Sequence, residues 1–237
     1  MSSWTPKRFW KTATVEACDG GFTVRLDARP VKTPGRALLA VPTEALAQAI
    51  AREWDAQHGV VRPQTMPCTR AANSAIEKVA PQFDEVVDLL AAYGDSDLLC
   101  YRASAPQELI TRQAAAWDPL LEWAAEALGA PLTVTAGVIH VPQPSASRHR
   151  LHELTAAMTP FQIAAFHDLV ALSGSLVLAF AVVRGRLSPD EAWAASRIDE
   201  TYQAELWGDD DDASALAESK RLDFHQAATF WTLCSPI

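Results

Sequence analysis

The residues with the clearest chemical potential lie between positions 188 and 212, where tryptophans alternate with carboxylates. Trp193, Glu200 and Trp207 recur every seven residues, so one continuous helix over residues 189–207 would place them on the same side. The opposite side of that helix would carry an apolar stripe. Such a helix either lies centrally in a helical bundle or presents one face to a partner, and the sequence leaves both interpretations open.

The other candidate groups do not form a catalytic pattern. Glu200 and Glu205 are five residues apart, so on a helix they point about 140° apart and cannot converge on one substrate atom. His149 and His152 lie one helical turn apart with Glu153 beside them, but a third metal ligand is missing. Nucleotide-binding, nucleophile-elbow and zinc-protease motifs are absent from the sequence. The residues therefore indicate no catalytic site, no cofactor and no metal site.

Composition favours a folded protein that does not bind nucleic acid. The chain has 237 residues, of which 49% are hydrophobic, enough for one large domain or two small ones. Its net charge of −9 is opposite to the balance that phosphate binding requires. Residues 1–36 are nevertheless basic overall, and residues 188–237 are strongly acidic. Four widely spaced cysteines are typical of reduced thiols.

Two segments bear on location. The first eleven residues show neither a signal peptide nor a basic amphipathic leader, so we expect a bacterial cytoplasmic protein. The uninterrupted apolar run at 169–183 would be about 22 Å long as a helix, whereas a bilayer core measures roughly 30 Å. We therefore interpret the run as a buried core helix and expect no membrane insertion.

The hydrophobic pattern predicts an α+β protein whose β-rich part comes first. Alternating runs at 9–17 and 22–28 flank a Gly-Gly turn, and a further run at 37–41 gives three or four antiparallel strands. From Thr43 the period becomes helical, with one extended segment at 130–141. After the first helix, further helices are predicted at 69–79, 82–93, 107–128, 147–157, 160–184, 189–207 and 213–233.

This change of pattern predicts two domains. The first, residues 1–80, is a small N-terminal antiparallel β-rich α+β domain. The second, residues 81–237, is a larger all-helical orthogonal bundle.

Short motifs follow one another along nearly the whole chain, and their order resembles a known family. The motifs are Arg8-Phe9-Trp10, Leu26-Asp27 with Lys32-Thr33-Pro34, Val41-Pro42-Thr43-Glu44-Ala45-Leu46, Glu53-Trp54-Asp55-Ala56-Gln57, Asp95-Ser96-Asp97-Leu98-Leu99-Cys100-Tyr101-Arg102, Trp117-Asp118-Pro119-Leu120-Leu121-Glu122-Trp123, and Ser196-Arg197-Ile198-Asp199-Glu200-Thr201-Tyr202-Gln203 with Trp207-Gly208. In this order they resemble the assembly chaperones of the F1 part of ATP synthase, a mitochondrial family with alphaproteobacterial relatives.

The resemblance implies a non-enzymatic function. Members of this family bind the unassembled α subunit of ATP synthase and shield its β-facing surface until hand-over, and we expect this chain to act as a monomer. The resemblance places the functional contacts on the helix that ends at Trp207-Gly208, with Glu200 as the leading polar contact. The predicted partner-binding residues are Glu200, Glu205, Trp207, Trp193, Arg197 and Gln203.

Two other classes of protein stay open at this level. One is a small-molecule enzyme with a carboxylate or histidine site between the two domains, which a cleft with convergent titratable groups would favour. The other is a constitutive subunit of a complex, which its presence in the fully assembled ATP synthase would favour.

Overall fold

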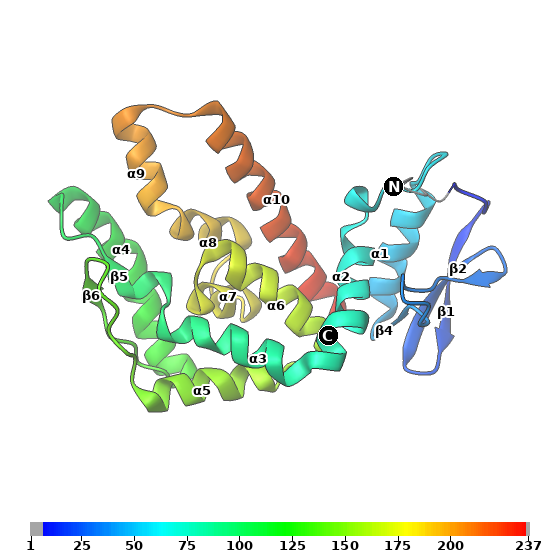
Figure 1. Ribbon diagram of the computed structural model, residues 1–237, viewed down its shortest axis with the longest axis horizontal. Helices are drawn as coiled ribbons and strands as arrows, with labels where there is room; N and C mark the ends of the chain where they lie inside the picture. The colour runs from blue at the N-terminus through cyan, green and yellow to red at the C-terminus, as the bar shows by residue number, and fades with distance from the viewer. Residues whose placement is uncertain (1–6, 236–237) are drawn as a thin grey trace. The chain divides into compact units, whose positions relative to one another are not determined.

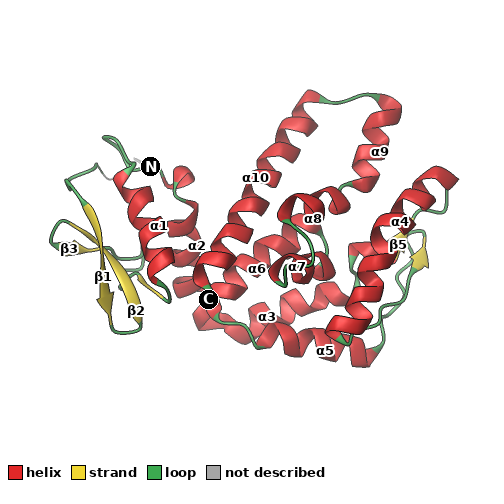
Figure 2. Ribbon diagram, turned by 180° about the vertical axis from the view of Figure 1, so that it is seen from behind, coloured by secondary structure: helices red, strands yellow, loops and turns green. Residues whose placement is uncertain are grey.

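The computed structural model describes residues 7–235, and the contacts within it divide the chain into two compact units. Unit 1 comprises Met1–Phe83, Thr159–Ala165 and Thr229–Ile237, and unit 2 comprises Asp84–Met158 and Phe166–Ala228. The strands of unit 1 precede a mainly helical chain, which confirms the predicted α+β class (Figure 1, Figure 2). The two predicted domains, 1–80 and 81–237, stay a prediction, and contacts assign two late segments to unit 1.

The sheet of unit 1 is built around one central strand. β1 (Ala13–Cys18) and β2 (Gly21–Leu26) form an antiparallel hairpin in which Cys18 lies opposite Gly21. Two short strands, β3 (Arg29–Pro30) and β4 (Ala40–Val41), also pair antiparallel with β2. Gly21 has a φ of 134°, and a Cβ there would collide with the Val41 carbonyl oxygen, so the approach of β4 requires glycine.

One face of β2 packs with the first helix to form the core of unit 1. Val24 and Leu26 are buried, and Phe22 packs against the same core, as the alternating pattern predicts. α1 (Glu44–Asp55) begins at Thr43, whose hydroxyl accepts a hydrogen bond from the Leu46 N–H at 3.1 Å. The late segments complete this core with Ala165, Phe230 and Cys234.

The remaining helices differ in detail from the predicted ranges. α2 (Pro67–Ser74) and α4 (Gln107–Trp123) are each continued by a π-helical turn, Ala75–Val79 and Ala124–Leu128. Single 3₁₀ turns occur at Pro63–Thr65, Ala80–Gln82, Ala92–Asp95 and Leu98–Cys100. The other helices are α3 (Phe83–Ala91), α5 (Ser145–Ala156), α6 (Pro160–Ser173), α7 (Leu176–Val183), α8 (Pro189–Ser196), α9 (Ile198–Trp207) and α10 (Asp211–Cys234).

Unit 2 also contains a small strand pair, so the prediction of an all-helical second part is wrong in this detail. β5 (Tyr101–Arg102) pairs in parallel with β6 (Thr135–Ala136). β6 is the part of the predicted extended segment 130–141 that finds a partner strand. The pairing partners are more than thirty residues apart in the sequence, so local patterning did not reveal them.

The helix predicted at 160–184 is divided into α6 and α7. Gly174 has a φ of 71°, which ends α6, and the Ser175 hydroxyl caps α7 by accepting from the Leu178 N–H at 3.0 Å. The run at 169–183 is therefore not one helix, but every side chain from Leu176 to Ala181 is buried, so the α7 part of the run lies in the core as predicted. Within residues 7–235, no helix is long and apolar enough to cross a membrane.

Candidate functional site

The segment singled out by the sequence, 189–207, forms two helices and not one. α8 ends at Ser196, Arg197 adopts a φ of −117°, and α9 starts at Ile198, so the prediction of one continuous helix is wrong. The cause is a contact from α4: the Trp117 indole N–H donates to the Ala195 carbonyl oxygen at 2.8 Å. A side chain that takes a carbonyl of the helical hydrogen-bond ladder interrupts the helix.

The start of α8 is a complete capping box. The Ser188 hydroxyl accepts from the Glu191 N–H at 3.3 Å, and Glu191 accepts from the Ser188 N–H at 2.7 Å. These hydrogen bonds from Ser188 lower the pKa of Glu191. Pro189 follows at the first helical position, where its missing N–H costs nothing. The carboxylate of Glu191 is therefore committed to the helix start.

Trp193 is a core residue of unit 2. Its side chain is 8% exposed, and its ring lies 5.8 Å from the Phe224 ring, between centroids. The Arg197 guanidinium covers it at 5.7 Å. Because the helix breaks after Trp193, this residue does not share an exposed side with Trp207. The predicted contact of Trp193 with a partner is therefore not retained.

Three of the predicted residues do share an exposed side, within α9 alone. Glu200, Gln203 and Trp207 are all exposed, and their spacing of three and four residues lines them up along one face of the helix. We call these three residues the α9 face. Trp207 is 79% exposed, and the next residue, Gly208, ends the helix with a φ of 89°. A large aromatic side chain thus stands in solvent at the end of α9.

The charge of Glu200 is only loosely engaged. Its carboxylate lies 2.7 Å from the Arg197 guanidinium, one turn earlier in the chain. Both side chains remain partly exposed, so the ion pair contributes little to stability.

Glu205 points in a different direction, toward α4. Its carboxylate lies 2.6 Å from the Arg112 guanidinium, which also pairs with Glu108 at 2.9 Å. The same guanidinium lies 5.2 Å from the centre of the Tyr202 ring, and the hydrogen bonds to the two glutamates raise the pKa of Arg112. Glu205 therefore connects α9 to α4 and is separate from the α9 face.

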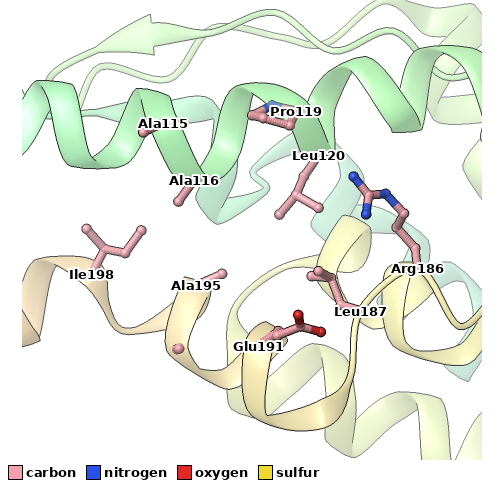
Figure 3. Close-up of a pocket in the computed structure, with 10 residues that line it drawn as sticks. Ala115, Ala116, Pro119, Leu120, Arg186, Leu187, Glu191, Ala195 and Ile198 are labelled. Atoms are coloured by element: carbon pink, nitrogen blue, oxygen red, sulfur yellow. The ribbon is translucent and has the colours of Figure 1, made fainter.

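Sequence reasoning missed a groove of about 500 Å³ between α4 and the α8–α9 region (Figure 3). Most of its lining is apolar and much of it is alanine. The lining residues are Ala115, Ala116, Pro119, Leu120, Arg186, Leu187, Glu191, Ala194, Ala195 and Ile198. The alanine pairs in α4 and α8 are the sequence signal for this groove. The groove itself forms only because these two helices, distant in the sequence, lie side by side.

The two histidines that the sequence singled out as possible metal ligands each have an ordinary acidic partner. His149 lies 3.2 Å from Glu153, whereas His152 lies 2.8 Å from Asp88 of α3. No group of three His, Cys, Asp or Glu side chains in the described part of the chain is placed to hold a metal ion. All four cysteines are free, and burial raises the pKa of the Cys100 thiol to about 12, so this thiol is unreactive.

Comparison with known proteins places the chain among chaperones. The model of a family described as ATP12 chaperone protein matches residues 7–125. The Schizosaccharomyces pombe protein named "Protein atp12, mitochondrial" is 30% identical over 223 residues, covering 89% of this chain and 76% of that protein. The chain belongs to the ATP12 chaperone family.

Solved structures agree with this assignment. A point mutant of Paracoccus denitrificans Atp12p is 50% identical, with a TM-score of 0.96 over 99% of this chain and 100% of that one. Atp12 from the same organism gives 51% identity and a TM-score of 0.95 over 97% and 98% of the two chains. The Atu1473 protein of Agrobacterium tumefaciens is 40% identical in sequence, with a TM-score of 0.92 over 97% of this chain and 87% of that one.

These relatives confirm two expectations drawn from the sequence. The family is that of the ATP synthase assembly chaperones, and its members are chaperones and not enzymes.

Proposed function

We propose that this chain is a monomeric cytoplasmic chaperone that binds the unassembled α subunit of F1-ATPase through the α9 face and shields the surface that α later gives to β. Membership of the ATP12 chaperone family supports the assembly role. An unassembled ATPase subunit exposes apolar surface and is prone to aggregate. A dedicated partner that covers this surface keeps the subunit from aggregating.

The observation that carries the proposal is the exposure of Trp207. A tryptophan that is 79% exposed at the end of a helix costs solubility, and tryptophan is the residue most often found as an energetic anchor in interfaces. Leu206 beside it is 55% exposed and enlarges the apolar contact. The side chain therefore has the placement of an anchor that inserts into a pocket on the client.

The charges around this anchor suit a contact that must be released. Glu200 lies two helical turns before Trp207 and four aspartates at 209–212 follow it, so acidic residues flank Trp207 in the sequence. Exposed charges of this kind set the register and the association rate of a complex more than its final affinity. We expect them to meet a basic rim around the apolar patch of the α subunit.

Co-expression of tagged chaperone variants with the α subunit of the host's ATP synthase tests this proposal. Trp207→Ala is expected to lower the recovery of α about tenfold or more, because loss of an anchor commonly weakens binding by more than 1.4 kcal/mol. Leu222→Ala removes a half-exposed apolar side chain outside the α9 face and is the matched control. Undiminished recovery of α with Trp207→Ala would remove the α9 face from the proposal.

The monomeric state and the location have separate tests. Light scattering of the purified protein should give the mass of one chain, 25.7 kDa. Fractionation of the host cell should place the protein in the cytoplasm, and recovery with the fully assembled ATP synthase would instead favour a constitutive subunit.

A further inference from the structure

The groove between α4 and the α8–α9 region is mainly apolar but carries a positive charge at one end. Leu120, Leu187 and Ile198 provide the larger apolar contacts, and small alanine side chains leave the space between them open. Figure 3 shows the Arg186 side chain at one end of this space and Ile198 near the other. The groove therefore offers an apolar floor with a cation at one end.

The Arg186 guanidinium is available for a ligand. Its side chain is exposed, and within residues 7–235 no hydrogen bond or ion pair engages the guanidinium, although its charge adds to the Ser188 hydrogen bonds in lowering the pKa of Glu191. The neighbouring carboxylate, Glu191, is held by the N–H and the hydroxyl of Ser188 at 2.7 and 2.8 Å. Among the lining residues Glu191 is the one acid, and its carboxylate is hydrogen-bonded to Ser188, so it meets the Arg186 charge through space and not as an ion pair.

We propose that this groove binds an apolar segment of the client protein, and that a carboxylate on this segment pairs with Arg186. The inference rests on the proposed chaperone function and adds a second contact region to the α9 face. Charge complementarity selects the occupant: a segment with no carboxylate would leave the guanidinium without a directly paired carboxylate beside a desolvated apolar surface. Arginine suits this role because its planar fork binds a carboxylate in two places.

The groove adjoins the α9 face, because both include residues of the first turn of α9. Ile198 lines the groove and is also the first residue of α9. Glu200 follows two residues later and opens the α9 face. One client segment can therefore lie in the groove while the adjoining surface reaches Trp207, and two moderate contacts together give a firm but reversible hold.

Charge reversal and groove filling test the proposal with the α subunit of the host's ATP synthase as the probe. Arg186→Glu is expected to weaken binding of α about tenfold, and Ala116→Phe is expected to weaken it by a similar factor by occupying the groove. Lys220→Glu on α10 and Ala127→Phe after α4 make the same changes at exposed positions that do not line the groove. Both control variants should bind α like the wild type.

A cross-linking experiment identifies the occupant. A photo-reactive phenylalanine analogue at Ala194, an exposed residue of the groove lining, should cross-link to an apolar α-subunit peptide that contains Asp or Glu. The same analogue at Ala127 should give no such product. If the wild type binds α while Arg186→Glu and Ala116→Phe bind equally well, the groove proposal is overturned and the chaperone function stands. If the wild type itself binds no α, the proposed function fails.

Discussion

Asp97 brings a carboxyl group into the interior of unit 2 and fixes the start of α7. It is fully buried and accepts hydrogen bonds from the Leu99 N–H at 3.0 Å, the Ser175 hydroxyl at 2.7 Å and the Val177 N–H at 3.0 Å. One side chain thus satisfies polar groups of two segments that are nearly eighty residues apart.

Removal of this side chain should be costly. Asp97→Ala would leave the donors on Leu99 and Val177 buried without partners, and we expect a loss of about 3 kcal/mol in the free energy of unfolding. Urea unfolding followed by circular dichroism measures this loss. Asp97→Asn retains an acceptor oxygen and should lose less, so an equal loss in both variants would contradict the hydrogen-bond explanation.

The same residue predicts a pH dependence. Burial raises the pKa of Asp97, so the folded state holds this proton more tightly than the unfolded state does. The stability that the group contributes is therefore full below its unfolded pKa of about 4 and is lost as the pH rises through the folded pKa. Relative to Asp97→Asn, which does not titrate there, the wild type should become less stable as the pH rises from 4. If the wild type instead becomes more stable relative to Asp97→Asn as the pH rises, the hydrogen bonds to the Asp97 carboxylate outweigh its burial.

Several residues of the motifs that reveal the family serve the fold and not the client. The Glu53 carboxylate accepts from the N–H groups of Cys68 and Thr69 at 2.6 and 2.8 Å, which caps α2. Gln57 is buried, and its side-chain Oε1 accepts from the Arg62 N–H at 2.8 Å. Motif order therefore predicted the family, but it could not by itself separate structural residues from contact residues.

At the scale of elements, local signals predicted helix starts better than helix interruptions. The capping box at Ser188 and Glu191 lies within four residues, and the predicted helix start at residue 189 is confirmed. The break at Arg197 depends on the Trp117 indole, which is 78 residues away from the carbonyl that it binds. The error carried over to the candidate site, because a continuous helix would have aligned Trp193 with Trp207.

The contribution of the α8 N-cap to the free energy of unfolding can be measured. Ser188→Ala removes the acceptor for the Glu191 N–H and should cost about 1 kcal/mol. For a chain of this length the loss corresponds to a decrease of roughly 2–4 °C in Tm. Ser188→Thr keeps a hydroxyl at the same position and should restore most of the stability. A Tm for Ser188→Ala equal to that of the wild type would mean that packing against α7 and α10, and not the cap, holds α8 in place.

At the scale of the whole molecule, the end of the chain returns to the core in which the chain begins. Phe230 is 1% exposed and belongs to the same core as Leu46 and Ile50 of α1. The Thr43 hydroxyl, at the start of α1, also donates to the Leu233 carbonyl oxygen. The change from strand to helix patterns indicated two parts, but local pattern could not assign these late residues to the first.

This arrangement predicts that a substitution near the C-terminus destabilises unit 1. Phe230→Ala should lower the free energy of unfolding by about 3–5 kcal/mol, because it leaves a cavity in the core. Hydrogen exchange should then increase at the amides of β2 and α1. The half-exposed Leu222, changed to Ala, is the control and should have little effect. Unchanged exchange in β2 and α1 would contradict the shared core.

The central claim is that the protein holds unassembled ATP synthase α, and a pull-down from the host's own lysate tests it most directly. Tagged wild-type protein should recover the α subunit without stoichiometric β, as identified by mass spectrometry. Glu200→Lys should recover clearly less α while its helical content and Tm stay nearly unchanged, because the carboxylate is exposed and loosely paired. Glu126→Lys makes the same charge change at an exposed position outside the α9 face and should recover α normally. A wild-type pull-down that contains no α subunit would contradict the account.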